Sequence, residues 1–319
     1  MLNTNEATGH QSDIREIDQL YEAQDRMRLA LDSFAKYVPS EVVRELLDKG
    51  EAAVIGGRNT SMSILFTDIA GFTAISEGMT PETLTAHMAN YFDAMIEIIT
   101  EHNGTVDKLI GDAIVALWGA PRENASHAQD AVLAALRCEE ALRELNREWE
   151  SNGLPKLPTR FGISTGEVMV GNVGSANRLS YTALGDSVNL ASRLEGANKY
   201  YGTRILAAEN SVEGSRDRFL WRKLDKVRVV GRSQPETIYE LLGERETVST
   251  EDLEKARKYE TALESYLNQQ FEAALEILRD LGGGGSGDLA VERLMSRCQD
   301  ALEKGETTGW DGVSKFSEK

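Results

Sequence analysis

A tight hairpin is the strongest structural signal in this sequence. The runs TVDKLI (105–110) and AIVALW (113–118) are apolar enough to form strands, and only Gly111 and Asp112 separate them. A two-residue link of this kind is typical of a β-hairpin, because glycine adopts the backbone angles that such turns require. Another apolar run, at 62–67, predicts a buried strand that ends directly before Asp68. The two features together place one carboxylate at a strand end and one at a hairpin turn.

Helical and extended patterns alternate through residues 61–243. Helices are predicted at 81–102, 124–150 and 187–201, the first with Thr80 as N-cap and Pro81 in its first turn. Further strands are predicted at 159–165 and 167–172, as a second hairpin about Gly166, and at 204–208, 219–230 and 236–242. This order predicts an α+β fold, a ferredoxin-like βαββαβ core with extra strands and with its helices on one face.

The N-terminal flank has three predicted parts. Residues 1–13 are expected to form a disordered tail, and 39–60 a connector with a short helix at 41–49. Between them, residues 14–38 place apolar side chains at heptad spacing, with Gln24 as the polar exception. The apolar positions are Ile17, Leu20, Met27, Leu31, Phe34 and Val38. This spacing is typical of a short parallel coiled coil, and it also fits an amphipathic helix packed on its own domain.

The C-terminal flank is predicted to be helical over residues 244–304. The segment ALESYLNQQFEAALEILRDL (262–281) resembles a single tetratricopeptide-like helical pair, which cannot bury its apolar face alone. We therefore expect it to pack on the middle domain or on a partner. GGGGSG (282–287) has the composition of a flexible linker, and 305–319 is expected to be a tail with Trp310 as a possible anchor.

Composition narrows the class of protein. With 41% hydrophobic and 27% charged residues among 319, the chain is typical of soluble globular proteins. A net charge of −17 argues against non-specific nucleic-acid binding. We expect no membrane segment, because no apolar run reaches the ~18–20 residues that span a bilayer. Cys138 and Cys298 show no pairing pattern, which favours a reducing cytoplasm.

Asp68 and Asp112 are the candidate metal ligands. Each aspartate alone is more often an ordinary turn residue. Asp68, however, precedes AGFT (70–73), whose glycine leaves backbone N–H groups free to face an anion. Two carboxylates beside such a turn suit a pair of divalent ions and a triphosphate. On the helix at 187–201, Asn189 and Arg193 share one face and suit a ribose and a phosphoryl group, although an ordinary surface helix fits equally well.

Three motifs together resemble one known family. FTDIAGFT, DKLIGDAIVALWG and YTALGDSVNLASRLE, in this order and spacing, resemble the catalytic domain of class III nucleotidyl cyclases over roughly residues 60–243. The resemblance implies that Asp68 and Asp112, with Ile69, hold two Mg²⁺ or Mn²⁺ ions per site. It also implies that Lys108 and Thr182 read the purine. Threonine at the second reading position is typical of a large bacterial subgroup of adenylyl cyclases.

The resemblance implies roles for the remaining candidates as well. Asn189 and Arg193 match the pair that orients the ribose and stabilises the transition state. Gly71, Phe72 and Thr73 match the substrate-binding turn. Arg232 stands about where the family often has a phosphate-binding lysine, so its role is less firmly implied.

Lys108 favours ATP as the substrate. Its ammonium group donates to adenine N1 but offers no acceptor to the N1–H of guanine. The expected reaction converts ATP into 3′,5′-cyclic AMP and pyrophosphate. In the family, one chain supplies the metal aspartates and another the purine and ribose readers, which implies a symmetric homodimer with two sites. We expect the heptad helix to transmit a signal from a partner or an upstream sensor.

Three alternatives remain beside this interpretation. A guanylyl cyclase is disfavoured by Lys108, and a diguanylate cyclase by the absence of a GG(D/E)EF hairpin. A catalytically silent dimerisation or scaffold module is disfavoured because all six key positions are filled.

Overall fold

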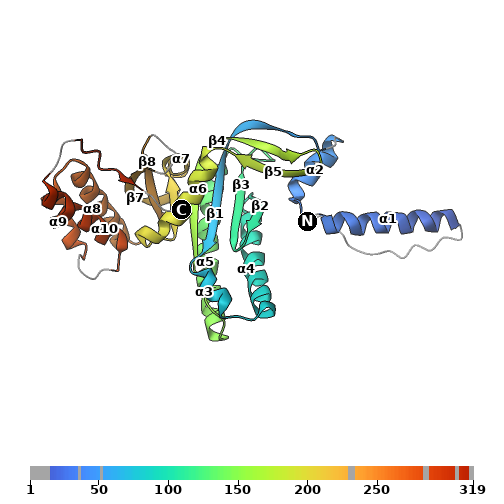
Figure 1. Cartoon of the computed structure of the whole chain (residues 1–319), viewed down its shortest axis with the longest axis horizontal. Coiled ribbons are helices and arrows are strands. Elements are labelled where there is room, and N and C mark those ends of the chain that lie inside the picture. Colours follow the sequence, from blue (N-terminus) through green and yellow to red (C-terminus); the bar gives the residue numbers. More distant parts are fainter. Residues whose placement is uncertain are drawn as a thin grey trace. The chain divides into compact units, whose positions relative to one another are not determined.

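The computed structural model describes residues 15–34, 37–50, 53–228, 234–282, 287–305 and 309–315 (Figure 1). The chain divides into two compact units, Met1–Ala53 and Val54–Lys319. The first unit contains helices α1 (Arg15–Phe34) and α2 (Ser40–Lys49), while the predicted tail at 1–13 lies outside the described residues. Leu20 and Met27, at two heptad positions of α1, are largely exposed. The pairing of α1 in a coiled coil stays a prediction.

The second unit is built on a mixed sheet. The described residues place its strands in the order β2-β3-β1-β4-β6-β8-β7-β9, and β5 pairs with β4. The β4–β6 and β7–β9 pairs are parallel and the remaining pairs antiparallel. The strands are β1 (Gly56–Ile69), β2 (Thr105–Ile110), β3 (Ala113–Trp118), β4 (Thr159–Ser175), β5 (Arg178–Leu184), β6 (Ile205–Ala208), β7 (Phe219–Arg228), β8 (Glu236–Glu244) and β9 (Ser314–Lys315). The predicted hairpin about Gly111 and Asp112 is confirmed as β2–β3.

The hairpin predicted about Gly166 is wrong. β4 is one continuous strand that pairs with β1 from Ile69↔Thr159 to Gly56↔Asn172. Gly166 is needed for a close approach, because a Cβ there would lie 2.4 Å from Ser187 Oγ. The real hairpin joins β4 to β5.

Two predicted boundaries also need correction. Residues 56–60, assigned to the connector, form the first part of β1, because residues 167–172 of β4 supply a partner strand. The predicted tail contains β9, which pairs with β7, and Trp310 anchors it by donating from Nε1 to the carbonyl oxygen of Leu267 over 3.2 Å. In both places a distant partner, rather than local propensity, creates the strand.

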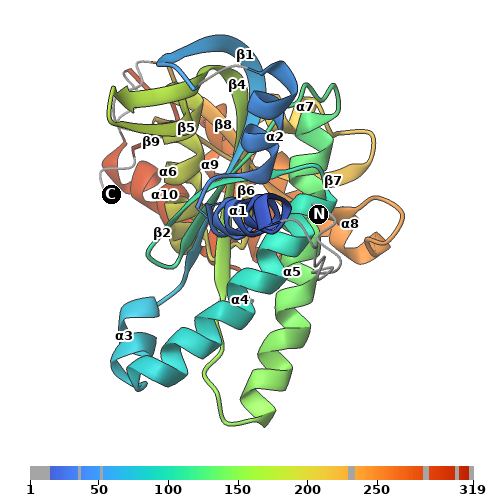
Figure 2. The same ribbon diagram turned by 90° about the vertical axis from the view of Figure 1, so that its right-hand side faces the viewer.

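The helices lie on both faces of the sheet, and the prediction of one face is wrong. Figure 2 shows α4 (Pro81–Glu101) and α5 (His127–Ser151) side by side; they share a core with Phe161 and Ile163 of β4. The intervening Gly162 faces α6 (Asp186–Tyr201) on the opposite face, where a Cβ would lie 2.1 Å from the carbonyl oxygen of Ala191. Alternate residues of a strand point to opposite faces, so glycine at 162 lets α6 lie close to β4. The short helices are α3 (Phe72–Glu77) and α7 (Glu209–Glu213).

The C-terminal helices pack on this unit. Figure 1 shows α8 (Thr250–Leu267), α9 (Phe271–Asp280) and α10 (Leu289–Lys304) beside β7 and β8. Their buried side chains join one apolar cluster with Leu194 and Tyr201 of α6 and Leu224 of β7. Of the two expected locations for this apolar face, the structure shows the middle domain. No helix in the described part of the chain is long and apolar enough to cross a membrane.

Candidate active site

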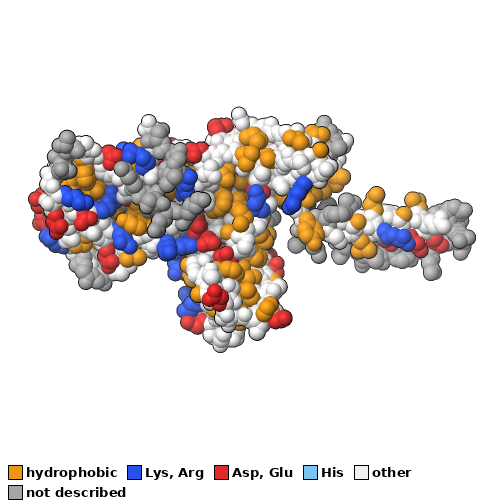
Figure 3. Space-filling view, in the orientation of Figure 1, with side chains coloured by type: hydrophobic (Ala, Val, Ile, Leu, Met, Phe, Trp, Pro, Cys, Tyr) orange, Lys and Arg blue, Asp and Glu red, His pale blue; other side chains and the backbone are white. Residues whose placement is uncertain are grey.

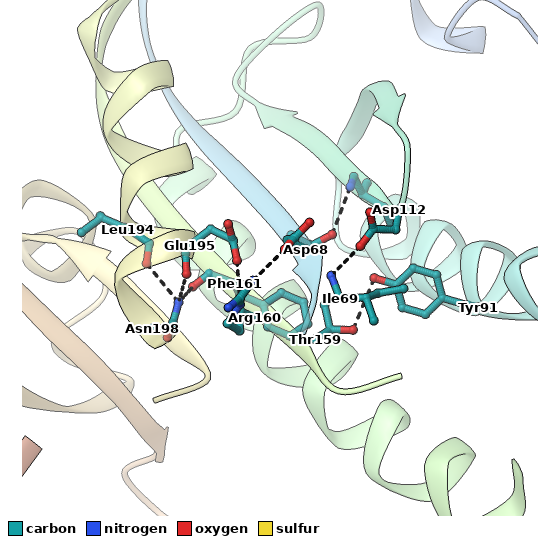
Figure 4. A network of polar contacts seen from close by, with 12 residues as sticks. Asp68, Ile69, Tyr91, Asp112, Thr159, Arg160, Phe161, Leu194, Glu195 and Asn198 are labelled. Carbon is teal, nitrogen blue, oxygen red and sulfur yellow. Dashed lines mark hydrogen bonds and ion pairs between the residues drawn. The ribbon is translucent and has the colours of Figure 1, made fainter. Parts of the chain in front are cut away.

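The fold brings Asp68 and Asp112 together. Asp68 lies near the end of β1, and Asp112 lies in the turn that joins β2 to β3, the strand beside β1. The backbone N–H of Ile69 donates to Asp112 Oδ2 over 3.0 Å (Figure 4). Gly111, with φ of 65°, permits the tight turn. The structure therefore places all three predicted metal ligands at one point.

The chemistry of this point suits a divalent cation. Burial, together with the negative charge of Asp112, raises the pKa of Asp68 above its ordinary value. A cation relieves this repulsion, and carboxylate oxygens with the Ile69 carbonyl are ligands that Mg²⁺ or Mn²⁺ accepts. Within the described residues, no cluster of three or more His, Cys, Asp or Glu forms a closed metal site.

Arg160 and Glu195 extend the carboxylate pair. Figure 4 shows Arg160 between Asp68 and Glu195. Its Nη2 donates to Asp68 Oδ2 over 2.6 Å, and its Nε lies 2.8 Å from Glu195 Oε1. Burial, opposed by Arg160, raises the pKa of Glu195 to about 7. Arg160 therefore balances part of the negative charge of Asp68.

The two predicted purine readers also meet. Lys108 of β2 donates from Nζ to Thr182 Oγ1 of β5 over 2.9 Å, although β2 and β5 are not neighbours in the sheet. Thr182 in turn donates its hydroxyl proton to Asp107 Oδ2 over 2.7 Å, and Lys108 Nζ lies 3.1 Å from the same oxygen. The Asp107 carboxylate is 4% exposed. Burial raises the pKa of Asp107, while Thr182 and Lys108 oppose the shift.

A β-bulge explains how Asp107 reaches both readers. Neighbouring residues of a regular strand point to opposite faces, but the register of β2 against β3 shifts between Val106 and Lys108. The extra residue lets Asp107 and Lys108 turn toward the same partner. The sequence interpretation did not include Asp107, since a bulge depends on the partner strand.

Asn189 and Arg193 lie on α6, apart from these two groups. Within the described residues, neither side chain makes a hydrogen bond to Asp68, Asp112, Lys108 or Thr182. The helix that carries them is fixed at its other end. There Asn198 Nδ2 donates to the Phe161 carbonyl oxygen over 2.9 Å.

The residues predicted to form a substrate-binding turn lie at the start of α3, and one predicted residue falls outside the described part of the chain. Gly71 adopts a left-handed conformation with φ of 74° and caps α3. Phe72 packs partly against the core, and Thr73 is exposed at the helix start. Arg232 lies outside the described residues.

Comparison with known proteins decides the family. A family model described as the adenylate and guanylate cyclase catalytic domain matches residues 56–243. The chain belongs to this cyclase family. Its α+β fold agrees, since the structure superimposes on a guanylyl cyclase, Cya2, with TM-score 0.57 and 36% identity over 61% of this chain and 98% of that one. The adenylyl cyclase CyaB from P. aeruginosa gives 0.56 and 32% over 61% and 100%.

Two similar proteins carry names that specify a nucleotide. Adenylate cyclase 1 of Rhizobium meliloti (strain 1021) is 43% identical over 75% of this chain and 36% of its own length. An adenylate cyclase of Anabaena cylindrica is 36% identical over 68% of this chain and 44% of its own length. The chain thus spans less than half of the length of these relatives.

Three residues of the cyclase domain were missed from the sequence. Arg160 stands directly opposite Asp68 in the β1–β4 register. The incorrect hairpin about Gly166 pairs residues 159–165 with 167–172 instead of with β1, so it does not place Arg160 beside Asp68. Glu195 lies within the quoted SRLE run, two residues after Arg193 on the same helix. Asp107 neighbours Lys108, and only the bulge turns it toward Thr182.

Proposed function

We propose that this chain is an adenylyl cyclase that converts ATP into 3′,5′-cyclic AMP and pyrophosphate. The names of the two curated relatives support this proposal. Names alone do not fix the base, because a guanylyl cyclase is equally similar in structure. The choice of adenine rests on the group formed by Asp107, Lys108 and Thr182.

The orientation of the Thr182 hydroxyl favours adenine over guanine. A hydroxyl has one proton and two lone pairs, and here the proton goes to Asp107. One lone pair accepts from Lys108, so the other is left to accept a proton from the base. The exocyclic amine of adenine donates such a proton, whereas the O6 of guanine only accepts. Lys108 adds a donor for adenine N1.

Two metal ions suit the other end of the site. We propose that Asp68, Asp112 and the Ile69 carbonyl hold them. Bound Mg²⁺ or Mn²⁺ would lower the pKa of the ribose 3′-hydroxyl and neutralise the polyphosphate. Arg160, already beside Asp68, would remain as a cation for phosphate oxygens.

Asn189 and Arg193 would act on the ribose and on the reacting phosphate. The ribose 3′-hydroxyl would give its proton to water, its oxygen would attack the α-phosphorus, the bond from that phosphorus to the α–β bridging oxygen would break, and pyrophosphate would leave. Asn189 would orient the ribose, and Arg193 would stabilise the charge that grows on the α-phosphoryl oxygens. Gly71, Phe72 and Thr73 would offer backbone N–H groups to the phosphates.

A second copy of the chain would complete each site. Among the described residues, no hydrogen bond links Asn189 or Arg193 to the metal aspartates or to the purine readers. Around the readers, Leu109, Ile110 and Leu184 are 44%, 55% and 48% exposed. Figure 3 shows hydrophobic side chains over the part of the molecule where Figure 1 places β1, β2 and β3. An apolar surface beside an incomplete site favours a symmetric homodimer.

Mixing two inactive variants tests the chemistry and the shared site together. Asp68→Ala removes a metal ligand, and Arg193→Ala removes the transition-state group. If one chain supplies the metal ligands and the other Arg193, a mixed dimer has one intact site. Half of the dimers in an equal mixture are mixed, so about a quarter of the wild-type rate should return.

The measurement is cyclic AMP formation from ATP and Mn²⁺, with each variant alone as the control. No recovery in the mixture, with subunit exchange verified by differently tagged chains, contradicts the shared site. If a wild-type dimer forms no cyclic AMP, the proposed cyclase activity is contradicted and the scaffold alternative is favoured. Faster turnover of GTP than of ATP favours a guanylyl cyclase.

A further inference from the structure

A cavity of about 240 Å³ lies where the C-terminal helices meet the sheet. Leu220 and Trp221 of β7 and Tyr239 of β8 form one side, and Leu253 and Ala256 of α8 form the other. Both the cyclase domain and the C-terminal segment therefore contribute to this cavity. None of the proposed catalytic residues lines it.

Three arginines converge on the cavity. Arg216 precedes β7, Arg245 follows β8, and Arg257 belongs to α8. In the described part of the chain, none of the three has a carboxylate within ion-pair distance. Nearby Arg218 and Arg222 differ, since Arg218 pairs with Glu244, and Arg222 pairs with Glu240 and Asp288.

The absence of ion-pair partners for these three arginines, among the described residues, is notable in so acidic a chain. The protein has 52 acidic and 35 basic residues, so carboxylates are in excess. The lining brings three guanidinium groups together with one carboxylate, Glu260, so positive charge is in excess there, and a bound anion reduces the repulsion between the arginines. Arginine is also the side chain best suited to phosphate, because its planar fork donates two parallel hydrogen bonds.

Two of the three arginines, Arg216 and Arg245, are held in position before any ligand arrives. The Arg245 backbone N–H donates to the Arg218 carbonyl over 2.9 Å, and Arg245 Nε donates to the Arg216 carbonyl over 2.8 Å. The Arg216 guanidinium stacks over the Tyr239 ring at 5.5 Å. For Arg216 and Arg245, less side-chain entropy would remain to be lost on binding.

The polar groups of the cavity wall favour an acceptor. The Trp221 side chain is 7% exposed, and its Nε1–H has no hydrogen-bond acceptor among the described residues. A buried donor without an acceptor costs free energy, so an acceptor placed beside Nε1 would be favoured. Glu260 is the carboxylate in the lining, and its Oε1 already accepts from the Lys223 backbone N–H over 2.7 Å.

We propose that this cavity binds a small phosphate-bearing anion, a phosphate monoester or a free phosphate. The phosphate group contacts Arg216, Arg245 and Arg257, and an organic substituent lies against Leu220, Leu253 and Tyr239. The ligand bridges the sheet and α8, and so stabilises the packing of the C-terminal helices on the cyclase domain.

The test is calorimetric titration of the full-length chain with inorganic phosphate and with phenyl phosphate. The buffer contains EDTA, and ionic strength is held constant with NaCl. Arg257→Gln and Arg216→Gln each remove one charge from the cavity. Arg147→Gln is the matched control, because it removes one exposed arginine from α5.

Wild-type protein should bind with a Kd of about 1 mM or lower, and each cavity variant about tenfold more weakly. The control should match wild type. Tighter binding of phenyl phosphate identifies a monoester as the ligand, and equal binding identifies free phosphate. Cyclase activity of Arg257→Gln should be retained.

Three results overturn the proposal. Equal weakening by Arg147→Gln means that net charge alone attracts the anion. Binding that survives in both cavity variants but is lost in Arg160→Gln places the phosphate in the active site. A Kd above about 10 mM in wild type means that no site exists for these anions.

Discussion

Replacing Asp107 with asparagine alters the purine-reading group without removing either reader. The change keeps the shape of the side chain and removes its charge. The Thr182 hydroxyl then loses its charged acceptor, and its proton is no longer directed inward. If the asparagine amide donates to Thr182 instead, the hydroxyl proton turns toward the base and matches the O6 of guanine.

The size of the effect follows from the hydrogen bonds that change. A hydrogen bond to a charged group contributes about 1.5–3 kcal/mol, and a neutral one about 1 kcal/mol. The Thr182–Asp107 bond is 2.7 Å long and its acceptor is 4% exposed, so solvent does not replace it. Losing about 1–2 kcal/mol lowers kcat/KM for ATP about 5- to 30-fold. Turnover of GTP should stay level or rise.

The assay compares kcat/KM for ATP and for GTP in the Asp107→Asn variant and in two controls. Thr182→Ser keeps the hydroxyl and should keep the wild-type preference. Thr182→Val removes it and should lose the preference. Thermal unfolding of each variant confirms that the fold is intact.

The reasoning is refuted if Asp107→Asn turns over ATP and GTP in the wild-type ratio, within twofold. An equal loss with both nucleotides also contradicts it, because the residue would then support the fold and not the choice of base.

Three further predictions concern stability and signalling. Folding raises the pKa of Glu195 from 4.5 to about 7, so in EDTA the free energy of unfolding should fall as pH rises through this window, by about 3 kcal/mol at most. Calorimetry should show that the free energy of unfolding depends less on pH in Glu195→Gln than in wild type. If the two proteins show the same pH dependence, the raised pKa of Glu195 is contradicted. Gly162→Ala should lower stability by about 2 kcal/mol or more because its Cβ meets the backbone of α6, whereas Gly196→Ala, with open space in the same helix, should be neutral or stabilising by up to about 1 kcal/mol. Similar unfolding temperatures for the two variants would argue against the close packing of α6 on β4. Inserting one to four residues within 20–38 should change cyclase turnover and leave the unfolding temperature unchanged. Constant turnover across the insertion series would contradict a signalling role for α1.

The sequence alone predicted the elements and residues that depend on short stretches of chain. The β2–β3 hairpin follows from two apolar runs about Gly111, and α4 begins as expected, with Thr80 accepting from the Thr83 backbone N–H. The candidate residues for metal, purine and ribose could be named because each lies in a contiguous motif. In such stretches the residue types themselves carry the information.

The tertiary structure decided what depends on a distant partner. A long β4, rather than a hairpin, exists because β1 pairs along it, from Ile69↔Thr159 to Gly56↔Asn172. Gly166 lets Ser187 lie close to the strand. Asp107 and Arg160 join the site through a bulge and through cross-strand register. Neither is visible in local periodicity, because strand pairing and register are set by which segments pack together, not by the residues of one segment.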